Sequence, residues 1–170
     1  MNNLQFEKVS FNQFAKDYRK NIRADILDEE LKNIYEKITL PKRSTTGSAG
    51  YDFVTPAQVN LTEESNVTTI PTGIRIVMPE NCFLAIVPRS GLGFKTGMRL
   101  ANTVGIIDSD YQYSDNEGHI MVKLVRGFKD CQIEAFDRFV QGIIMSYVST
   151  LTDSEDEKQI RNGGFGSSGR

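Results

Sequence analysis

The sequence contains few of the residues from which proteins build metal centres and disulfide frameworks. His119 is its only histidine, which excludes zinc proteases of the H-E-x-x-H type and any histidine-rich metal site. Cys82 and Cys131 are its two cysteines, and they belong to no C-x-x-C pair, so neither a zinc cluster nor a disulfide framework is indicated. We expect two buried, reduced thiols and a His119 ring that either faces solvent or has its hydrogen-bond partners within the protein.

Long apolar runs and basic runs are also missing. No stretch approaches the roughly 18 apolar residues that a membrane span requires. The first five residues have neither the basic nor the apolar region of a secretion signal, so we expect a cytoplasmic protein without a membrane partner. The net charge is −2, whereas binding to a nucleic-acid backbone depends on many cationic contacts. The sequence therefore predicts no nucleic-acid partner, and any phosphate site must be local.

The first forty residues have a helical pattern. Ser10 followed by Gln13 fits a capping box, and apolar residues then recur every three or four positions as far as Ile22. A second pattern runs from Leu27 to Ile38, with acidic residues near its start, where the helix dipole favours them. We expect two helices that cover a core built by later residues.

Short strand candidates separated by turn residues fill the chain from Tyr51 to about Tyr147. Residues 74–78 place Arg75 between Ile74 and Ile76, as in an alternating strand, and residues 82–87 are typical of a strand buried on both faces. Many short strands at this spacing predict an all-β fold, an antiparallel jelly-roll-like barrel. With 170 residues we expect a single domain. Its expected parts are a helical N-terminal extension (1–40), a β-barrel (41–150), and a linker with a flexible C-terminal arm (151–170).

Two polar segments follow predicted strands and could carry chemistry. The first places Arg89 and Ser90 with two glycines at a strand end, where side chains and exposed N–H groups can hold phosphate oxygens. The second brings Asp108 beside an apolar hairpin, where its carboxylate could activate water. In the same segment Tyr111 could pack against a ring, and the Asn102 amide could bind a base edge. Taken alone, each segment is more typical of a turn or of a hairpin with solvated aspartates.

Three further segments carry polar groups at notable places. Asp52 stands at the start of the barrel, and Gln141 lies inside an otherwise apolar strand, where a buried amide needs partners. The last ten residues combine glycines, serines and two arginines around Phe165. Glycine lets backbone N–H groups approach phosphate oxygens, and arginine adds a planar charged fork. Such an end is either a disordered terminus or a mobile lid over a phosphorylated ligand.

Together these segments resemble the five motifs of the trimeric dUTP pyrophosphatases (dUTPases) of bacterial or phage type. The resemblance extends from about Leu40 to Arg170, and the motifs stand in the family's order. They are Ala49-Gly50-Tyr51-Asp52, Pro88 to Gly93, Gly105 to Tyr111, Asp137 to Gln141, and Arg161 with Gly164 to Gly169. A joint match to all five is highly specific.

The resemblance implies hydrolysis of dUTP to dUMP and pyrophosphate, which keeps uracil out of DNA and supplies dUMP for dTMP synthesis. It also implies a homotrimer, active sites shared between three subunits, and Mg²⁺ as cofactor. Asp108 would be the general base that activates water for attack on the α-phosphorus. Asp52 would hold Mg²⁺ through water. Tyr111, packed under the deoxyribose, would clash with the 2′-hydroxyl of a ribose.

The other site residues implied by the resemblance divide between the two halves of the nucleotide. Uracil and deoxyribose would be bound by Asn102, Gly105, Ile106, Ile107, Tyr111, Met121 and, from the tail, Phe165. Phosphate oxygens would be bound by Arg89, Ser90, Gly91, Gln141 and, from the tail, Arg161, Gly166, Ser167 and Ser168. The tail of a third subunit would close over both halves.

One segment departs from the family's pattern. Five residues, Tyr113–Glu117, stand before Gly118, where the pattern places a glycine almost directly after the tyrosine. We expect them to lengthen the hairpin tip without loss of the pocket. Deamination of dCTP, a reaction of the same fold, needs a glutamate on the returning strand, and His119–Leu124 has none. The alternative is a non-catalytic or moonlighting nucleotide-sensing regulator, with an unidentified protein partner on the helical segment or on the insertion.

Overall fold

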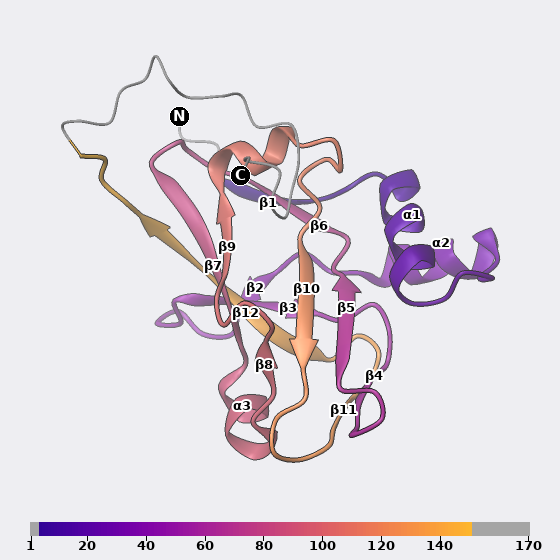
Figure 1. Cartoon of the computed structure of the whole chain (residues 1–170). Helices are drawn as coiled ribbons and strands as arrows, with labels where there is room; N and C mark the ends of the chain where they lie inside the picture. The colour runs from indigo at the N-terminus through magenta and orange to yellow at the C-terminus, as the bar shows by residue number, and fades with distance from the viewer. Residues whose placement is uncertain (1–3, 151–170) are drawn as a thin grey trace.

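The computed structural model describes residues 4–150, whose regular structure consists mainly of short β-strands (Figure 1). The elements are β1 (Gln5–Lys8), α1 (Phe11–Asn21), α2 (Asp28–Lys37), β2 (Lys42–Arg43), β3 (Gly50–Val54), β4 (Val59–Leu61), β5 (Val67–Pro71), β6 (Ile74–Val77), β7 (Cys82–Pro88), α3 (Ser90–Thr96), β8 (Arg99–Leu100), β9 (Gly105–Asp108), the 3-10 helix η1 (Ser109–Tyr113), β10 (Met121–Val125), β11 (Cys131–Ile133) and β12 (Arg138–Ser146). The tail residues predicted to bind nucleotide lie outside the described residues; they are Arg161, Phe165, Gly166, Ser167 and Ser168.

The strands form antiparallel sheets, as predicted for a jelly-roll-like fold. The largest sheet has the order β2-β3-β12-β7-β9, and a three-stranded sheet has the order β5-β10-β8. Two further ladders join β1 to β6 and β11 to β4. Within residues 4–150 no ladder links these four sheets into one closed barrel. The strands instead enclose the core from several sides.

One hydrophobic core joins the sheets to the N-terminal helices. Phe14 of α1 and Leu31 of α2 belong to the same buried cluster as Phe53, Leu84 and Phe139 of the large sheet. Burying a side chain of this size contributes about 1.5–3 kcal/mol relative to leaving it exposed. α1 packs on β5, and Figure 1 shows both helices beside that strand. The helices are therefore part of the packed fold.

The N-terminal segment holds both predicted helices and one strand that was not predicted. β1 pairs with β6, with Phe6 opposite Ile76, so residues 1–40 are not helical throughout. β1 has only four residues, and only Phe6 among them is apolar. Four residues with one apolar side chain show too little alternation to indicate a strand. The segment forms a strand because β6 offers it an edge with which to pair.

The strands on either side of the predicted hairpin do not pair with each other. β9 pairs with β7, whereas β10 pairs with β5 and β8. The expectation of a paired hairpin is therefore wrong, because each strand takes its hydrogen bonds from a different sheet. The insertion also differs from a simple extension of the tip: its start completes η1, and Ser114–Gly118 turns back towards α1.

The insertion caps the N-terminus of α1. Ser10 Oγ accepts a hydrogen bond from Gln13 N at 3.1 Å, which confirms half of the predicted capping box. The Gln13 side chain donates to Asp17 instead of to Ser10. Its place is taken by the Glu117 carboxylate, which accepts from Ser10 N at 2.7 Å and from Ser10 Oγ at 2.6 Å. The N-terminal helical segment and the insertion, which match none of the family's five motifs, are thus joined by hydrogen bonds.

Replacing Glu117 with glutamine is expected to weaken folding at neutral pH and to matter less in acid. Burial alone would raise the pKa of Glu117, but the hydrogen bonds from Ser10 outweigh burial and lower it. A carboxyl group with a lowered folded-state pKa stabilises the fold above its unfolded pKa of about 4.3, and this contribution is lost as pH falls through the folded value. We expect a loss of about 1 kcal/mol at pH 7, the usual worth of a helix cap.

Urea unfolding at one protein concentration, at pH 7, 5, 4 and 3, measures this difference between the wild type and Glu117→Gln. The two unfolding free energies should converge below about pH 4. Asp115→Asn, an exposed change in the same turn, serves as the control and should leave the curve unaltered. A gap between wild type and Glu117→Gln that stays constant down to pH 3 would contradict the role of the carboxylate.

The lone histidine has its hydrogen-bond partners within the protein, which was one of the two expectations for this ring. His119 is fully buried, and its Nε2 accepts from Gly73 N at 2.8 Å. Nδ1 therefore carries the proton and donates to Asp17 at 2.6 Å. Burial would raise the pKa of Asp17, yet the hydrogen bonds from His119 and Gln13 outweigh it and lower that pKa. The ring links α1 to the start of β10.

Two other sequence expectations concern the thiols and the membrane. Both cysteines are free; Cys131 is buried, whereas Cys82 is only half-buried. The helices within residues 4–150 are too short and too polar for any of them to cross a bilayer.

Candidate functional site

Three neighbouring strands bring the first, second and fourth motifs together. β12 lies between β3 and β7, and Gln141 stands opposite Asp52 on one side and Val87 on the other. Arg89 follows β7 directly. Residues that are far apart in the sequence therefore meet because antiparallel pairing sets their register.

Asp52 is the centre of the charged cluster at this place. Its Oδ1 lies 3.4 Å from Arg89 Nε, and its Oδ2 accepts from Arg138 Nη1 at 3.0 Å and from Ser44 Oγ at 2.6 Å. The Asp52 side chain is 13% exposed. The carboxylate therefore fixes both guanidinium groups. Arg138 and Ser44 were not among the predicted site residues, although Arg138 stands inside the fourth motif.

Gly50 explains the glycine of the first motif. An ideal Cβ on Gly50 would lie 2.3 Å from Gln141 Oε1, well inside contact distance. A side chain at position 50 would therefore force the amide of Gln141 to move from the place that it occupies here. This arrangement gives the polar residue of β12 a fixed place beside Asp52.

A cationic cavity of about 380 Å³ lies next to the cluster. Arg89, Lys95 and Arg138 contribute positive charge that outweighs the single carboxylate of Asp137, and Gly91 lines the cavity as well. Ser90 and Gly91 are the first residues of α3 and are exposed. Guanidinium and ammonium groups around one cavity are suited to phosphate oxygens.

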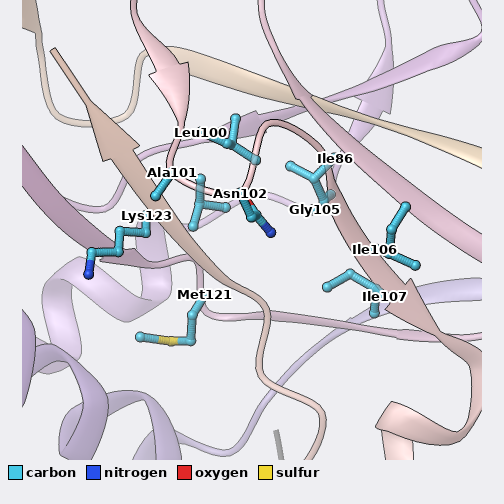
Figure 2. Close-up of a pocket in the computed structure, with 10 residues that line it drawn as sticks. Ile86, Leu100, Ala101, Asn102, Gly105, Ile106, Ile107, Met121 and Lys123 are labelled. Carbon is cyan, nitrogen blue, oxygen red and sulfur yellow. The ribbon is translucent and has the colours of Figure 1, made fainter. Parts of the chain in front are cut away.

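A second cavity, of about 150 Å³, lies between β9 and β10. Figure 2 shows the residues around it, which are mostly apolar apart from Asn102 and Lys123. The predicted base-binding residues Asn102, Gly105, Ile106, Ile107 and Met121 all line this cavity. Sequence reasoning missed Ile86, Leu100, Ala101, Val122 and Lys123, which reach it because β7, β8 and β10 surround the same space.

Two other predicted residues stand near this cavity without lining it. Asp108 is exposed and ends β9, on the same face of the strand as Ile106, because side chains two positions apart point the same way. Tyr111 is 6% exposed, and its hydroxyl donates to the His119 carbonyl oxygen at 3.1 Å. Asp108 directly follows the lining residue Ile107, and His119, the partner of Tyr111, lies two residues before the lining residue Met121.

Asp108 and the cationic cavity lie at opposite ends of β7. Asp108 stands opposite Phe83, near the start of β7, whereas Arg89 follows its end. Six residues separate Phe83 from Arg89, which corresponds to about 20 Å along a strand. Figure 1 shows the 3-10 helix η1, which follows β9, and the helix α3 at opposite ends of the molecule. Within one chain, Asp108 and Arg89 are therefore too far apart to act on the same phosphate group.

Comparison with known sequences identifies relatives over most of the chain. Residues 36–169 match the family model for dUTPase. The deoxyuridine 5'-triphosphate nucleotidohydrolase of Lactococcus lactis subsp. lactis is 41% identical over 135 residues, which cover 78% of this chain and 89% of the relative. The enzyme of the same name from Azotobacter vinelandii is 40% identical over 155 residues, with 88% and 97% covered.

Solved structures have the same fold. A dUTPase from Streptococcus mutans superposes with a TM-score of 0.60 at 30% identity, over 85% of this chain and 97% of that one. A point mutant of the dUTPase from phage phi11 of S. aureus also gives a TM-score of 0.60, at 18% identity, over 93% and 99%. The family model, the relatives at about 40% identity and the fold agree with the five motifs, and the chain belongs to the dUTPase family.

Proposed function

We propose that the protein hydrolyses dUTP to dUMP and pyrophosphate, in active sites shared between the subunits of a homotrimer. The observation that carries this proposal is the separation of two residues: Asp108 ends β9 beside an apolar pocket of base size, and Arg89, which lines the cationic cavity, stands about 20 Å away along β7. A nucleotide that used both would have to lie between two copies of the chain. Family membership supports the same reading.

The pocket between β9 and β10 would bind uracil and deoxyribose. β9 is the edge strand of its sheet, so its outer N–H and C=O groups are available to pair with the Watson–Crick edge of a base. Uracil differs from cytosine at position 4 of that edge, and the Asn102 amide adds a polar contact. The narrow space between Ile106 and Met121 would exclude the methyl group of thymine.

Asp108 would orient and deprotonate the attacking water, since a carboxylate within one hydrogen bond of the water is the requirement for a general base. Arg89, Ser90 and Gln141 of a second subunit would hold phosphate oxygens. The tail of a third subunit, outside the described residues, would close the site. There Arg161 would pair with the γ-phosphate, Phe165 would stack on uracil, and Gly166, Ser167 and Ser168 would donate to phosphate oxygens.

The residues present are compatible with Mg²⁺ bound mainly by the substrate. Among residues 4–150 there is no group of three or more His, Cys, Asp or Glu side chains that could hold a metal, and Mg²⁺ commonly uses substrate phosphates and waters. Asp52 Oδ1 has a single cationic neighbour, so it retains room to accept from a metal-bound water. The similar phi11 enzyme coordinates a structural Mg(II) ion. Mg²⁺ on the triphosphate would neutralise charge on the leaving pyrophosphate.

A pyrophosphate-release assay on dUTP, dCTP, dTTP and UTP tests the proposal. We expect turnover of dUTP, with the other three nucleotides lower by about 100-fold in kcat/KM, because each adds or lacks a group that the pocket discriminates. Removal of Mg²⁺ with EDTA should lower the rate, and added Mg²⁺ should restore it. The absence of turnover with Mg²⁺ and dUTP would leave a nucleotide sensor, whereas ammonia released from dCTP would indicate a deaminase.

A further inference from the structure

Asn116 belongs to the insertion and contacts the tyrosine that the proposed function places under the sugar. Asn116 Nδ2 donates to Tyr111 Oη at 2.8 Å and lies 3.3 Å from the His119 carbonyl oxygen. Tyr111 Oη in turn donates to that same carbonyl oxygen at 3.1 Å. The phenol thus accepts one hydrogen bond and donates another. Together the two bonds fix the position of the ring.

The turn that carries Asn116 is closed tightly on itself. Asn116 Oδ1 accepts from Gly118 N at 3.2 Å. Gly118 has a φ of +72°, and a Cβ there would lie 2.8 Å from Gln112 Cα. The amide of Asn116 therefore joins both ends of the turn, with its oxygen on Gly118 and its nitrogen on Tyr111.

Contacts with α1 and β6 hold this turn from outside. Glu117 binds the N-terminus of α1 through Ser10. Arg75 of β6 donates from Nη2 to the carbonyl oxygen of Gln112 at 3.1 Å. His119, directly after the turn, donates to Asp17 of α1. The donor on Asn116 is therefore fixed by elements that belong to the packed core.

We propose that Asn116 is a positioning residue for the selection of deoxyribose: it holds the Tyr111 phenol in the place at which a ribose 2′-hydroxyl would clash. This inference rests on the proposed function of the site. Steric exclusion requires a wall that does not move, because a ring free to shift would make room for one extra oxygen. The N-terminal helix and the insertion then contribute to substrate selection without touching the nucleotide.

The test compares kcat/KM for dUTP and for UTP in the wild type, Asn116→Ala and Asn116→Asp. Asn116→Asp keeps an acceptor for Gly118 N and loses the donor to Tyr111. We expect the preference for dUTP over UTP to fall about threefold to tenfold in both variants, the effect of one net hydrogen bond. Asp115→Ala, in the same turn and exposed, is the matched control and should keep the wild-type preference.

A double-mutant cycle with Tyr111→Phe separates positioning of the ring from support of the fold. If Asn116 acts through the phenol, Asn116→Asp should change the preference by less than about twofold once the hydroxyl is gone. An unchanged preference in Asn116→Asp, or equal losses of kcat/KM for dUTP and UTP, would overturn the inference. Wild-type protein without dUTP turnover would instead contradict the proposed function. Should Asn116→Ala fail to fold, Asn116→Asp decides.

Discussion

Replacing Asp108 with asparagine is expected to lower kcat for dUTP hydrolysis by about 10³-fold, since a positioned general base contributes 10²–10⁴-fold. Asparagine has nearly the same size and shape but does not take up a proton at neutral pH. Asp108 is exposed at the end of β9, on the face shared with Ile106 of the pocket. A base at this place would reach water above the α-phosphorus while the pyrimidine occupies the cavity.

Binding and turnover should separate in this variant. The dissociation constant for a non-hydrolysable dUTP analogue, measured by calorimetry, should change by less than about tenfold, because the pocket and the phosphate cluster are intact. Asp110→Asn serves as the control: Asp110 is an exposed carboxylate two residues further on, within η1, and its replacement should leave kcat close to the wild-type value. Wild-type kcat in Asp108→Asn would remove this residue from its proposed role.

Individual strands could be predicted where the strand's own sequence shows a pattern of apolar side chains. The expected strands at residues 74–78 and 82–87 correspond to β6 and β7. β1 was not predictable because four residues with one core side chain carry no period of their own. The pairing of β9 could not be predicted for a related reason. β9 pairs with β7, some twenty residues earlier in the chain, and the turn that follows β9 carries no information about this partner.

The sequence allowed candidate site residues to be named, but it did not indicate their contacts. The order of the motifs indicated Asp52, Arg89 and Gln141, yet the contacts of Asp52 with Arg138 and Ser44 follow from the register of three strands. The insertion gave no sequence signal for its partner, because Glu117 and Ser10 are 107 residues apart. Long-range polar contacts of this kind depend on the packed fold and have no local pattern.

Two impaired variants are expected to restore part of the lost activity when their subunits assemble into mixed trimers. In Arg89→Ala the loss of a charge-assisted contact to phosphate should lower kcat/KM by at least about tenfold, and Asp108→Asn should lack the base. Because Asp108 and Arg89 stand about 20 Å apart along β7, one active site would take Asp108 from one subunit and Arg89 from the next. A mixed trimer then contains a site in which both residues are wild type.

The expected yield follows from threefold symmetry. In a trimer with two copies of one variant and one of the other, either way round, only one of the three interfaces pairs a wild-type Asp108 with a wild-type Arg89, so about a third of the wild-type kcat should return. Mixed trimers are obtained by co-expression with two different affinity tags and sequential purification. Each variant co-expressed with a differently tagged copy of itself is the control and should keep the low activity of that variant. Because a site built within one chain cannot be restored by mixing, mixed trimers without regained activity would contradict the shared site.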